Sequence, residues 1–361
     1  MTTIPADCVS LFDYERYFHE RVDPAIRAYI AGAAADGITQ HENRRAFDRV
    51  RIMPRALVDL STATASTTLF GETLDYPILI GPTAWHKLVC EPGEMATAQA
   101  ASLTRTWMTV STQASVSLEA IAQASSAPLW FQLYMQPQWD DTLTLVRRAE
   151  QAGYRALVVT VDAPINGIRN VEQRAGFRLP PGIESVNLRG LARAPVADSR
   201  AGSPVFKGML AGAPTWSDIE RLARATTLPV VLKGILNPAD VAPALAAGTA
   251  GLIVSNHGGR TLDTVPATLD VLPDIAAAVN ARVPVLLDGA VRRGTDVLKA
   301  LALGAQAVLL GQPVLHALAV GGVAGVAHML TILQTELEAA MALAGVSKLE
   351  QVPRETVRLL P

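Results

Sequence analysis

The chain has 361 residues, of which 50% are hydrophobic, 18% are charged and only 5% are aromatic. This composition excludes a disordered or fibrous protein and predicts a core built mainly from Ala, Val, Leu and Ile. The 31 basic and 33 acidic residues leave a net charge of −2. That balance lacks the cationic excess typical of proteins that bind nucleic acid or an anionic membrane, so we expect neither partner.

The cysteines and the N-terminus indicate a reducing, cytoplasmic environment. Cys8 and Cys90 are too few for a disulfide framework, and no Cys/His cluster has the spacing of a metal site. The N-terminal segment lacks the basic and apolar regions of a signal peptide. The most apolar window, 317–327, is about half of the roughly 20 residues that cross a bilayer. We therefore expect no metal site and no membrane span.

Residues 1–70 precede a regular pattern of short apolar runs and are expected to form a helical N-terminal extension. The runs are rich in Val, Ile and Leu and end in polar or Gly/Pro clusters; in chain order they are 77–82, 106–112, 128–134, 156–164, 229–234, 251–258, 284–289 and 307–313. Continuous apolar runs predict strands covered on both faces, and helix-like segments lie between them. Eight such units predict a TIM (β/α)8 barrel over residues 77–313.

Two helix starts can be placed between the later strands. Ser217 with Glu220 indicates a capping box, and Asn237 followed by Pro238 indicates an N-cap with a proline in the first turn.

A long irregular segment, residues 165–215, separates the fourth and fifth predicted strands. A stretch of this length in a compact domain typically serves as a lid or a binding loop, and the alternative is a disordered insertion. Residues 314–361 follow the last strand and are expected to form C-terminal helices. The chain 1–361 is thus predicted to be a single domain.

Polar residues gather where the predicted strands end, which is where TIM barrels place their active sites. They are Gln132, Tyr134, Thr160, Asp162, Lys233, Ser255, His257 and Asp288. Any one of them alone would more often be a rim charge or a helix cap, but a whole cluster is costly to desolvate unless it binds a ligand. Because Arg169, Lys233 and Arg260 are cationic, we expect that ligand to be anionic.

Glycines and Arg292 follow the last two predicted strands, in residues 288–296 and 310–313. TIM barrels often bind phosphate at this place, because glycine lets backbone N–H groups approach the oxygens and a helix N-terminus favours negative charge. Glycine turns also serve plain chain reversal, so this motif by itself indicates a phosphate site only moderately.

The strings FQLY, VLKGI, VSNHGGRTLD and DGAVRRGTDVLKALALGA resemble the signatures of the FMN-dependent α-hydroxy acid oxidase and dehydrogenase family. The resemblance extends from about residue 10 to residue 345 and includes GPTA at 81–84, TVDAP at 160–164 and MALAG at 341–345. It implies an FMN-dependent (S)-2-hydroxy acid oxidase that forms a 2-oxo acid and passes the electrons to oxygen. It also implies a homotetramer.

The resemblance assigns catalytic roles to His257, Asp162, Tyr134 and Lys233, and substrate-binding roles to Arg260, Arg169 and Tyr134. By position, His257 would take a proton from the substrate, oriented by Asp162. The two arginines would hold the substrate carboxylate, and Tyr134 would hydrogen-bond the reacting oxygen. Lys233 would stabilise the negative charge of the reduced flavin.

A further set of residues is expected to bind FMN. It consists of Pro82, Thr83, Ala84, Ser111, Gln132, Thr160, Lys233, Asp288, Gly289, Arg292, Gly311 and Gln312. The resemblance places the residues up to Thr160 around the isoalloxazine ring, Asp288 at the ribityl chain, and Gly289, Arg292 and Gly311 around the phosphate.

Four positions depart from the family pattern: Ala28, Gln113, Ala290 and Gln312. Ala28 aligns with a tyrosine that binds the substrate carboxylate, so a vacancy there predicts a preference for mandelate-like or long-chain acids. The alternative is that Trp85 or the 165–215 loop fills this space. Gln312 aligns with an arginine that contacts the phosphate, which predicts weaker FMN binding.

Two other functions stay open at this point. One is a dehydrogenase that passes its electrons to a quinone or a protein acceptor. The other is a non-catalytic FMN-binding barrel, which the retained Lys233, His257 and Arg260 argue against.

Overall fold

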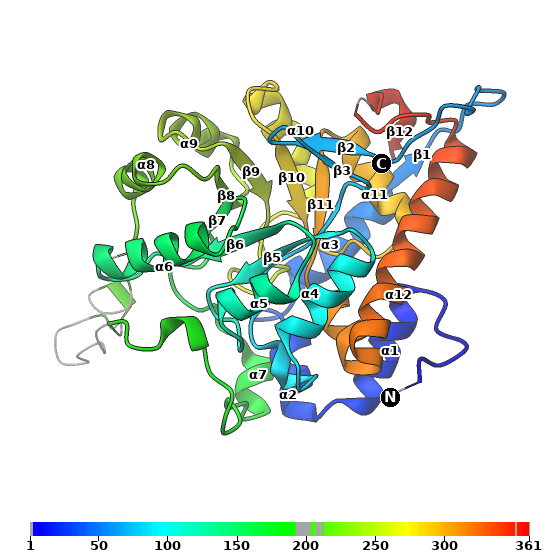
Figure 1. Ribbon diagram of the computed structural model, residues 1–361. Helices are drawn as coiled ribbons and strands as arrows, with labels where there is room; N and C mark the ends of the chain where they lie inside the picture. Colours follow the sequence, from blue (N-terminus) through cyan, green and yellow to red (C-terminus); the bar gives the residue numbers. More distant parts are fainter. Residues whose placement is uncertain are drawn as a thin grey trace.

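Eight parallel strands close into a barrel at the centre of the molecule (Figure 1). They are β4 Ile78–Ile80, β5 Trp107–Ser111, β6 Leu129–Leu133, β7 Leu157–Thr160, β8 Val230–Ile235, β9 Gly251–Val254, β10 Val285–Asp288 and β11 Ala307–Leu310. Seven lie inside the predicted runs, β8 extends one residue beyond its run, and β11 pairs with β4 to close the ring. The predicted TIM barrel is confirmed. The computed structural model describes residues 3–192, 203, 205–206, 210, 213–350 and 352–360.

Helices that follow the strands form the outer layer of the barrel. They are α4 Glu94–Leu103, α5 Leu118–Ala124, α6 Trp139–Gln151, α8 Trp216–Ala225, α9 Val241–Ala246, α10 Thr268–Val279 and α11 Gly294–Ala302. The start of α8 differs from the prediction by two residues, because Thr215 is the N-cap and forms the capping box with Asp218. Asn237 caps the 3-10 turn Pro238–Asp240 as predicted.

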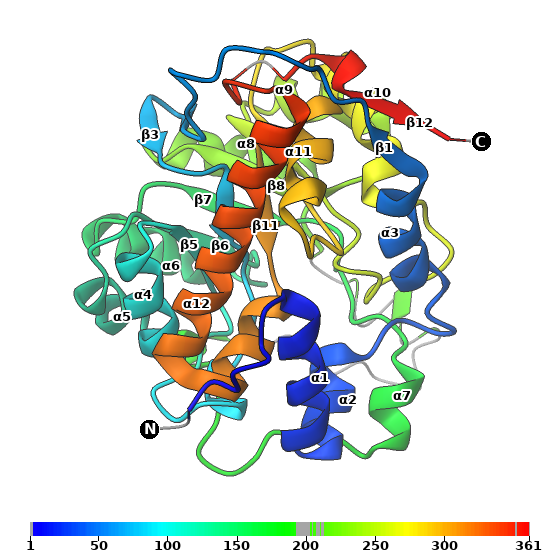
Figure 2. The ribbon, with the colours of Figure 1, turned by 90° about the vertical axis from the view of Figure 1, so that its right-hand side faces the viewer.

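The predicted helical extension contains α1 Leu11–Arg21, α2 Pro24–Ala31 and α3 Ile38–Arg49. Figure 2 shows α1 packed against the long C-terminal helix. The extension also contains strands that were not predicted. β1 Val50–Ile52 pairs with β12 Val357–Leu359 near the C-terminus, and β2 Thr67–Leu69 forms a hairpin with β3 Glu72–Leu74.

The β2–β3 hairpin closes the amino-terminal end of the barrel. Leu69 and Leu74 belong to the same buried cluster as the inward-facing barrel residues Leu79, Trp107 and Trp130. This apolar plug fills one end of the barrel and leaves the carboxyl ends of the strands for polar residues.

The described part of the segment 165–215 contains regular structure that was not predicted. It contains α7 Asn170–Arg174, which packs against α2, and a 3-10 turn at Val186–Leu188. A local pattern could not reveal α7, because five residues are too few to show helical periodicity. The central part of the segment, 193–202, 204, 207–209 and 211–212, lies outside the described residues.

The C-terminal region is helical over most of its length and ends in a 3-10 turn, Arg354–Thr356, and the strand β12, which was not predicted. α12 Gln312–Ala344 breaks at Gly322, where φ is 57° and ψ is −137°. By length and composition it could cross a membrane, and 56% of its most apolar window is buried inside the protein. It packs against α1, α4 and α11, so burial accounts for its apolar side chains.

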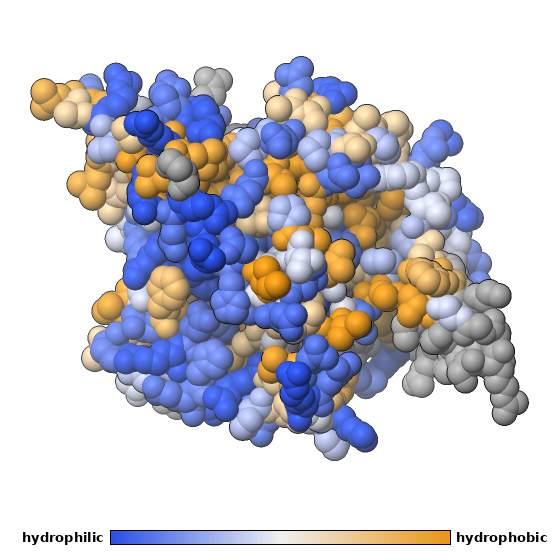
Figure 3. All heavy atoms as spheres, turned by 180° about the vertical axis from the view of Figure 1, so that it is seen from behind, coloured by the Kyte–Doolittle hydropathy of each residue, from blue (hydrophilic) through white to orange (hydrophobic). Residues whose placement is uncertain are grey.

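The face opposite to that of Figure 1 mixes hydrophilic and hydrophobic residues (Figure 3). This mixture agrees with charged residues of both signs spread along the chain.

Candidate active site

A cavity of about 1290 Å³ opens at the carboxyl ends of the barrel strands. Its lining includes a residue at or just after the end of every strand: Gly81, Ser111, Gln132, Thr160, Lys233, His257, Asp288 and Gly311. Nearly all the site residues expected from the sequence line this cavity. The exceptions are Asp162, which is bonded to His257, and Ser255, which is bonded to Lys233.

The imidazole of His257 is bonded to the carboxylate of Asp162. The distance between Nδ1 of His257 and Oδ1 of Asp162 is 2.8 Å. Burial would raise the pKa of Asp162, but the charges of Lys233 and His257 outweigh it and hold that pKa below its ordinary value. An ionised Asp162 places the proton of a neutral imidazole on Nδ1, which leaves Nε2 as the nitrogen that can accept another proton.

Lys233 lies in a buried polar cluster beside this pair. Its Nζ is 3.0 Å from Oδ2 of Asp288 and donates to Oγ of Ser255 at 2.7 Å. Burial would lower the pKa of Lys233, but the carboxylates of Asp288 and Asp162 outweigh it and raise the pKa to about 12. The ammonium group is therefore a permanent positive charge in the cavity.

Two arginines converge on the other side of the cavity. Nε of Arg169 donates to the backbone carbonyl of Arg260 at 3.2 Å, and Nη1 of Arg169 is 3.2 Å from Oε2 of Glu172. Burial, together with the like charge of Arg169, lowers the pKa of Arg260 to about 10. Two arginines accompanied by a single carboxylate, that of Glu172, favour an anionic ligand, as the sequence predicts.

Tyr29, not Ala28, faces this anion site. Ala28 is buried in α2 and does not line the cavity, whereas the ring of Tyr29 lines it and stacks on Phe177, with 4.5 Å between the ring centroids. Trp85 packs on the same ring at 5.4 Å, and the Arg260 guanidinium lies 5.6 Å from its centroid. The prediction of a vacancy is wrong. Adjacent side chains on a helix point about 100° apart, so Tyr29 faces the site although Ala28 does not.

Trp85 and the 165–215 segment, the two features that could fill this space according to the sequence, both pack on Tyr29; the segment does so through Phe177. Trp85 follows the GPTA string with a left-handed backbone, φ 50°, and its Nε1 donates to Oγ of Ser185 at 3.0 Å. Phe177 comes from the irregular segment, where no pattern marks it. The sequence pointed to Trp85 by name, and to the 165–215 segment without naming Phe177.

A row of buried polar side chains runs across β5, β6 and β7. Oγ of Ser111 donates to Oε1 of Gln132 at 3.1 Å, and Nε2 of Gln132 donates to Oγ1 of Thr160 at 3.0 Å. Tyr134 follows on the same side, and burial raises its pKa to about 12, so its hydroxyl stays protonated. Such a row can hydrogen-bond the edge of a flat heterocycle.

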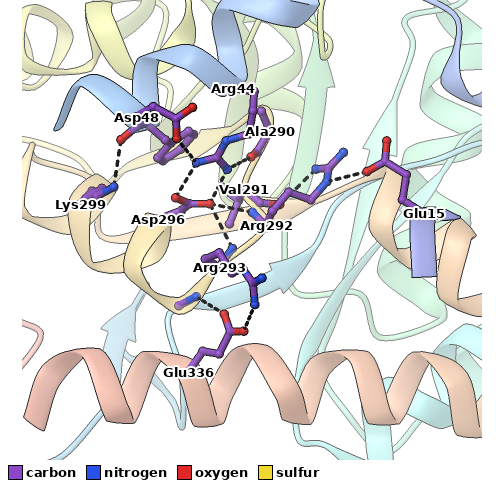
Figure 4. Close-up of polar contacts among 12 residues, drawn as sticks. Glu15, Arg44, Asp48, Ala290, Val291, Arg292, Arg293, Asp296, Lys299 and Glu336 are labelled. Atoms are coloured by element: carbon purple, nitrogen blue, oxygen red, sulfur yellow. Dashed lines mark hydrogen bonds and ion pairs between the residues drawn. The ribbon is translucent and has the colours of Figure 1, made fainter. Parts of the chain in front are cut away.

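The far end of the cavity is built around the N-terminus of α11 (Figure 4). One carboxylate oxygen of Asp296 accepts from the backbone N–H groups of Arg292 at 2.9 Å and Arg293 at 3.0 Å, and both oxygens bind Arg44 at 2.6 and 2.9 Å. Nε of Arg292 is 3.5 Å from Oε2 of Glu15 on α1. This network holds the turn that carries the Arg292 guanidinium.

The cavity fits FMN on the chemistry of its own residues. Oδ1 of Asp288 is buried without a hydrogen-bond partner among the described residues, so a ribityl hydroxyl would satisfy it. Gly289 adopts φ 106°, which favours glycine, and it lines the cavity together with Arg292. The polar row of Ser111, Gln132 and Thr160 matches the flavin ring. The charge of Lys233 matches the part of the ring that is reduced, and Arg292 matches the phosphate.

Comparisons with known proteins agree with this geometry. The family model described as FMN-dependent dehydrogenase matches residues 18–359. The chain is 45% identical to an L-lactate oxidase from Nostoc sp., over 99% of this chain and all of that protein. It is 41% identical to glycolate oxidase 3 of Arabidopsis thaliana, over 98% of this chain and 96% of the relative.

Solved structures give the same result. A mandelate oxidase variant with (S)-mandelic acid superimposes with a TM-score of 0.89 at 39% identity, covering 97% of this chain and 98% of that chain. With the family model, the relatives and the fold in agreement, the chain belongs to the family of FMN-dependent dehydrogenases.

Proposed function

We propose that this protein oxidises a 2-hydroxy acid to the 2-oxo acid and passes the two electrons to oxygen, forming hydrogen peroxide. The observation that carries the proposal is the placement of His257, which is bonded to Asp162, in one cavity with Lys233, Arg169 and Arg260. This set combines a base, a carboxylate-binding site and a permanent positive charge.

The side chains divide the work of the reaction. The arginines hold the substrate carboxylate, and with Nδ1 of His257 bonded to Asp162, Nε2 takes a proton from the substrate. Tyr134 donates a hydrogen bond to the reacting oxygen. FMN, when bound, supplies the two-electron acceptor. Lys233 stabilises negative charge that develops beside the polar row of Ser111, Gln132 and Thr160.

Oxygen is the proposed acceptor because the compared relatives are named as oxidases. For the substrate we propose a short acid such as lactate. Tyr29, Trp85 and Phe177 pack together at the anion site, and relatives at 45% identity are L-lactate oxidases. A homotetrameric assembly and a cytoplasmic location complete the proposal, and light scattering on the purified protein measures the assembly.

Anaerobic reduction of the bound flavin by a panel of hydroxy acids tests the function. We expect lactate to bleach the flavin and air to restore its colour with one hydrogen peroxide per cycle. Glycolate, 2-hydroxyoctanoate and both mandelate enantiomers complete the panel, and chromatography of the released flavin should show FMN. A flavin that no member of the panel reduces would contradict the proposal, and slow recovery in air with fast recovery by a quinone would contradict oxygen as the acceptor.

A further inference from the structure

Gln312, the first residue of α12, lies between the two ends of the cavity. Its Nε2 donates a hydrogen bond to the carbonyl oxygen of Ile30 at 2.9 Å, and its Oε1 accepts one from Nη2 of Arg292 at 3.4 Å. This orientation of the amide satisfies both partners, because a carbonyl oxygen can only accept and a guanidinium can only donate. The two halves of one side chain therefore serve different parts of the site.

The carbonyl of Ile30 has a second donor in Arg260. Nη1 of Arg260 donates to it at 3.0 Å and also to the carbonyl of Gly32 at 2.6 Å. These carbonyls belong to the C-terminal end of α2, where backbone oxygens lack partners within the helix. Gln312 and Arg260 together hold the end of the helix that carries Tyr29.

A continuous chain of hydrogen bonds thus joins the phosphate end of the cavity to the substrate end. It runs from Arg292 to Gln312, then through the Ile30 carbonyl to Arg260, and all four residues line the cavity. The direction of the Arg260 guanidinium depends on where the last turn of α2 lies. Gln312 is the link that ties this turn to the start of α12.

We propose that Gln312 is a positioning residue for the substrate: it holds the end of α2 so that Arg260 and Tyr29 meet the substrate carboxylate. The inference rests on the proposed function. A side chain that served only the cofactor phosphate would need no bond to the Ile30 carbonyl. The same chain of bonds makes substrate affinity depend on contacts at the phosphate end, and linkage requires the dependence to be mutual.

The variant Gln312→Met tests this, because methionine keeps the length of the side chain and removes both hydrogen bonds. With FMN at saturating concentration, we expect the Kd of the 2-oxo acid product and the KM of the hydroxy acid to rise about five- to tenfold, the loss expected for one hydrogen bond. We expect kcat to change less than about twofold. The product Kd is read from the absorbance of the bound flavin and needs no turnover.

Two further variants separate the halves of the side chain. Gln312→Arg keeps a donor for the Ile30 carbonyl, so it should retain the substrate KM of the wild type. Gln312→Glu keeps an acceptor for Arg292 and loses that donor, so it should show the raised KM. The Kd of FMN for each apoprotein is measured separately by fluorescence titration. Gln306→Met, at an exposed position, is the matched control.

An unchanged product Kd and KM in Gln312→Met would overturn the inference. If FMN binding weakens while the product Kd and KM stay unchanged, Gln312 is a phosphate contact alone. Equal substrate affinities for the Arg and Glu variants would overturn the inference too, even if the Met variant fails to fold. A wild-type protein that neither turns over nor binds any 2-oxo acid would overturn the proposed function, a result visible without any variant.

Discussion

His257 has a backbone conformation that residues other than glycine seldom adopt. Its φ is 57°, and Gly258 and Gly259 continue the left-handed turn with φ of 66° and 75°. The turn leaves the imidazole within hydrogen-bond distance of Asp162, which follows β7, two strands away in the barrel. Gly259 cannot be replaced without movement, because a Cβ there would lie 2.6 Å from the backbone nitrogen of Gln40. The motif is constrained by packing as well as by chemistry.

Replacing His257 with alanine should slow anaerobic flavin reduction by about two to four orders of magnitude, the range for a positioned acid or base. FMN should stay bound, because the polar row and Arg292 are untouched. Stopped-flow absorbance measures the reduction in a single turnover. His41→Ala, on the exposed side of α3, is the control. A near-normal rate of flavin reduction in His257→Ala would show that His257 is not the base.

Ala290 carries backbone strain at the phosphate turn. Its φ is 57°, where an L residue costs about 1–2 kcal/mol and glycine does not. Ala290→Gly should therefore raise the free energy of unfolding by up to about 1 kcal/mol, after the greater freedom of glycine in the unfolded chain is subtracted. Urea denaturation of the FMN-saturated protein measures it. A less stable variant would show that the alanine methyl packs favourably enough to outweigh the strain.

At the scale of elements, the N-terminal helices depend on the barrel for their caps. The N-cap of α3 is Gly37, which has no side chain. Asp263 supplies the missing acceptor: its carboxylate accepts from the backbone N–H groups of Asp36 at 3.1 Å, Ile38 at 3.2 Å and Thr39 at 2.8 Å. The loop after His257 therefore holds the start of α3 in place.

Asp263→Ala should lower the free energy of unfolding at neutral pH by about 1–2 kcal/mol, as for loss of a helix cap. Burial would raise the pKa of Asp263, but the backbone N–H groups outweigh it and hold that pKa below 3.8. A lowered pKa in the folded state means that the stabilisation is complete above pH 3.8 and is lost as the pH falls through the lowered value.

Urea denaturation across this pH range measures the free energy of unfolding of the wild type and of Asp263→Ala. Asp274→Ala, at an exposed position on α10, is the control. The two curves should converge on acidification. A difference in free energy of unfolding that grows towards acid pH would contradict the role of the charged carboxylate.

At the scale of the whole molecule, the N-terminal extension takes part in the active site at both ends. α2 carries Tyr29 to the substrate end, while Glu15 on α1 is 3.5 Å from Arg292 at the phosphate end. Burial lowers the pKa of Arg292, and the charge of Glu15 opposes this effect. The carboxylate therefore competes with an incoming phosphate for the same guanidinium.

Glu15→Gln should tighten FMN binding about two- to fivefold, because a partly exposed ion pair is worth up to about 1 kcal/mol. Fluorescence titration of the apoprotein at constant ionic strength measures the Kd. Glu20→Gln, exposed on the same helix, should leave it unchanged. Weaker binding in Glu15→Gln would mean that the carboxylate orients Arg292 rather than competing for it.

Much of the barrel and of its site could be predicted from the sequence. A strand covered on both faces is apolar along its whole length, and this signal is local, so all eight strands were found. The catalytic rim followed from the same signal, because strand ends fix where Lys233, His257 and Asp288 must lie. The resemblance then supplied the roles that spacing alone left open.

Tertiary structure decided the contacts that join distant parts of the chain. The phase of α2, which places Tyr29 rather than Ala28 at the anion site, depends on how the helix packs and not on its composition. The cap that Asp263 gives to α3 and the pairing of β1 with β12 likewise leave no local pattern. Propensity and periodicity describe neighbours in sequence, whereas these contacts gain their free energy only after the barrel has brought both partners together.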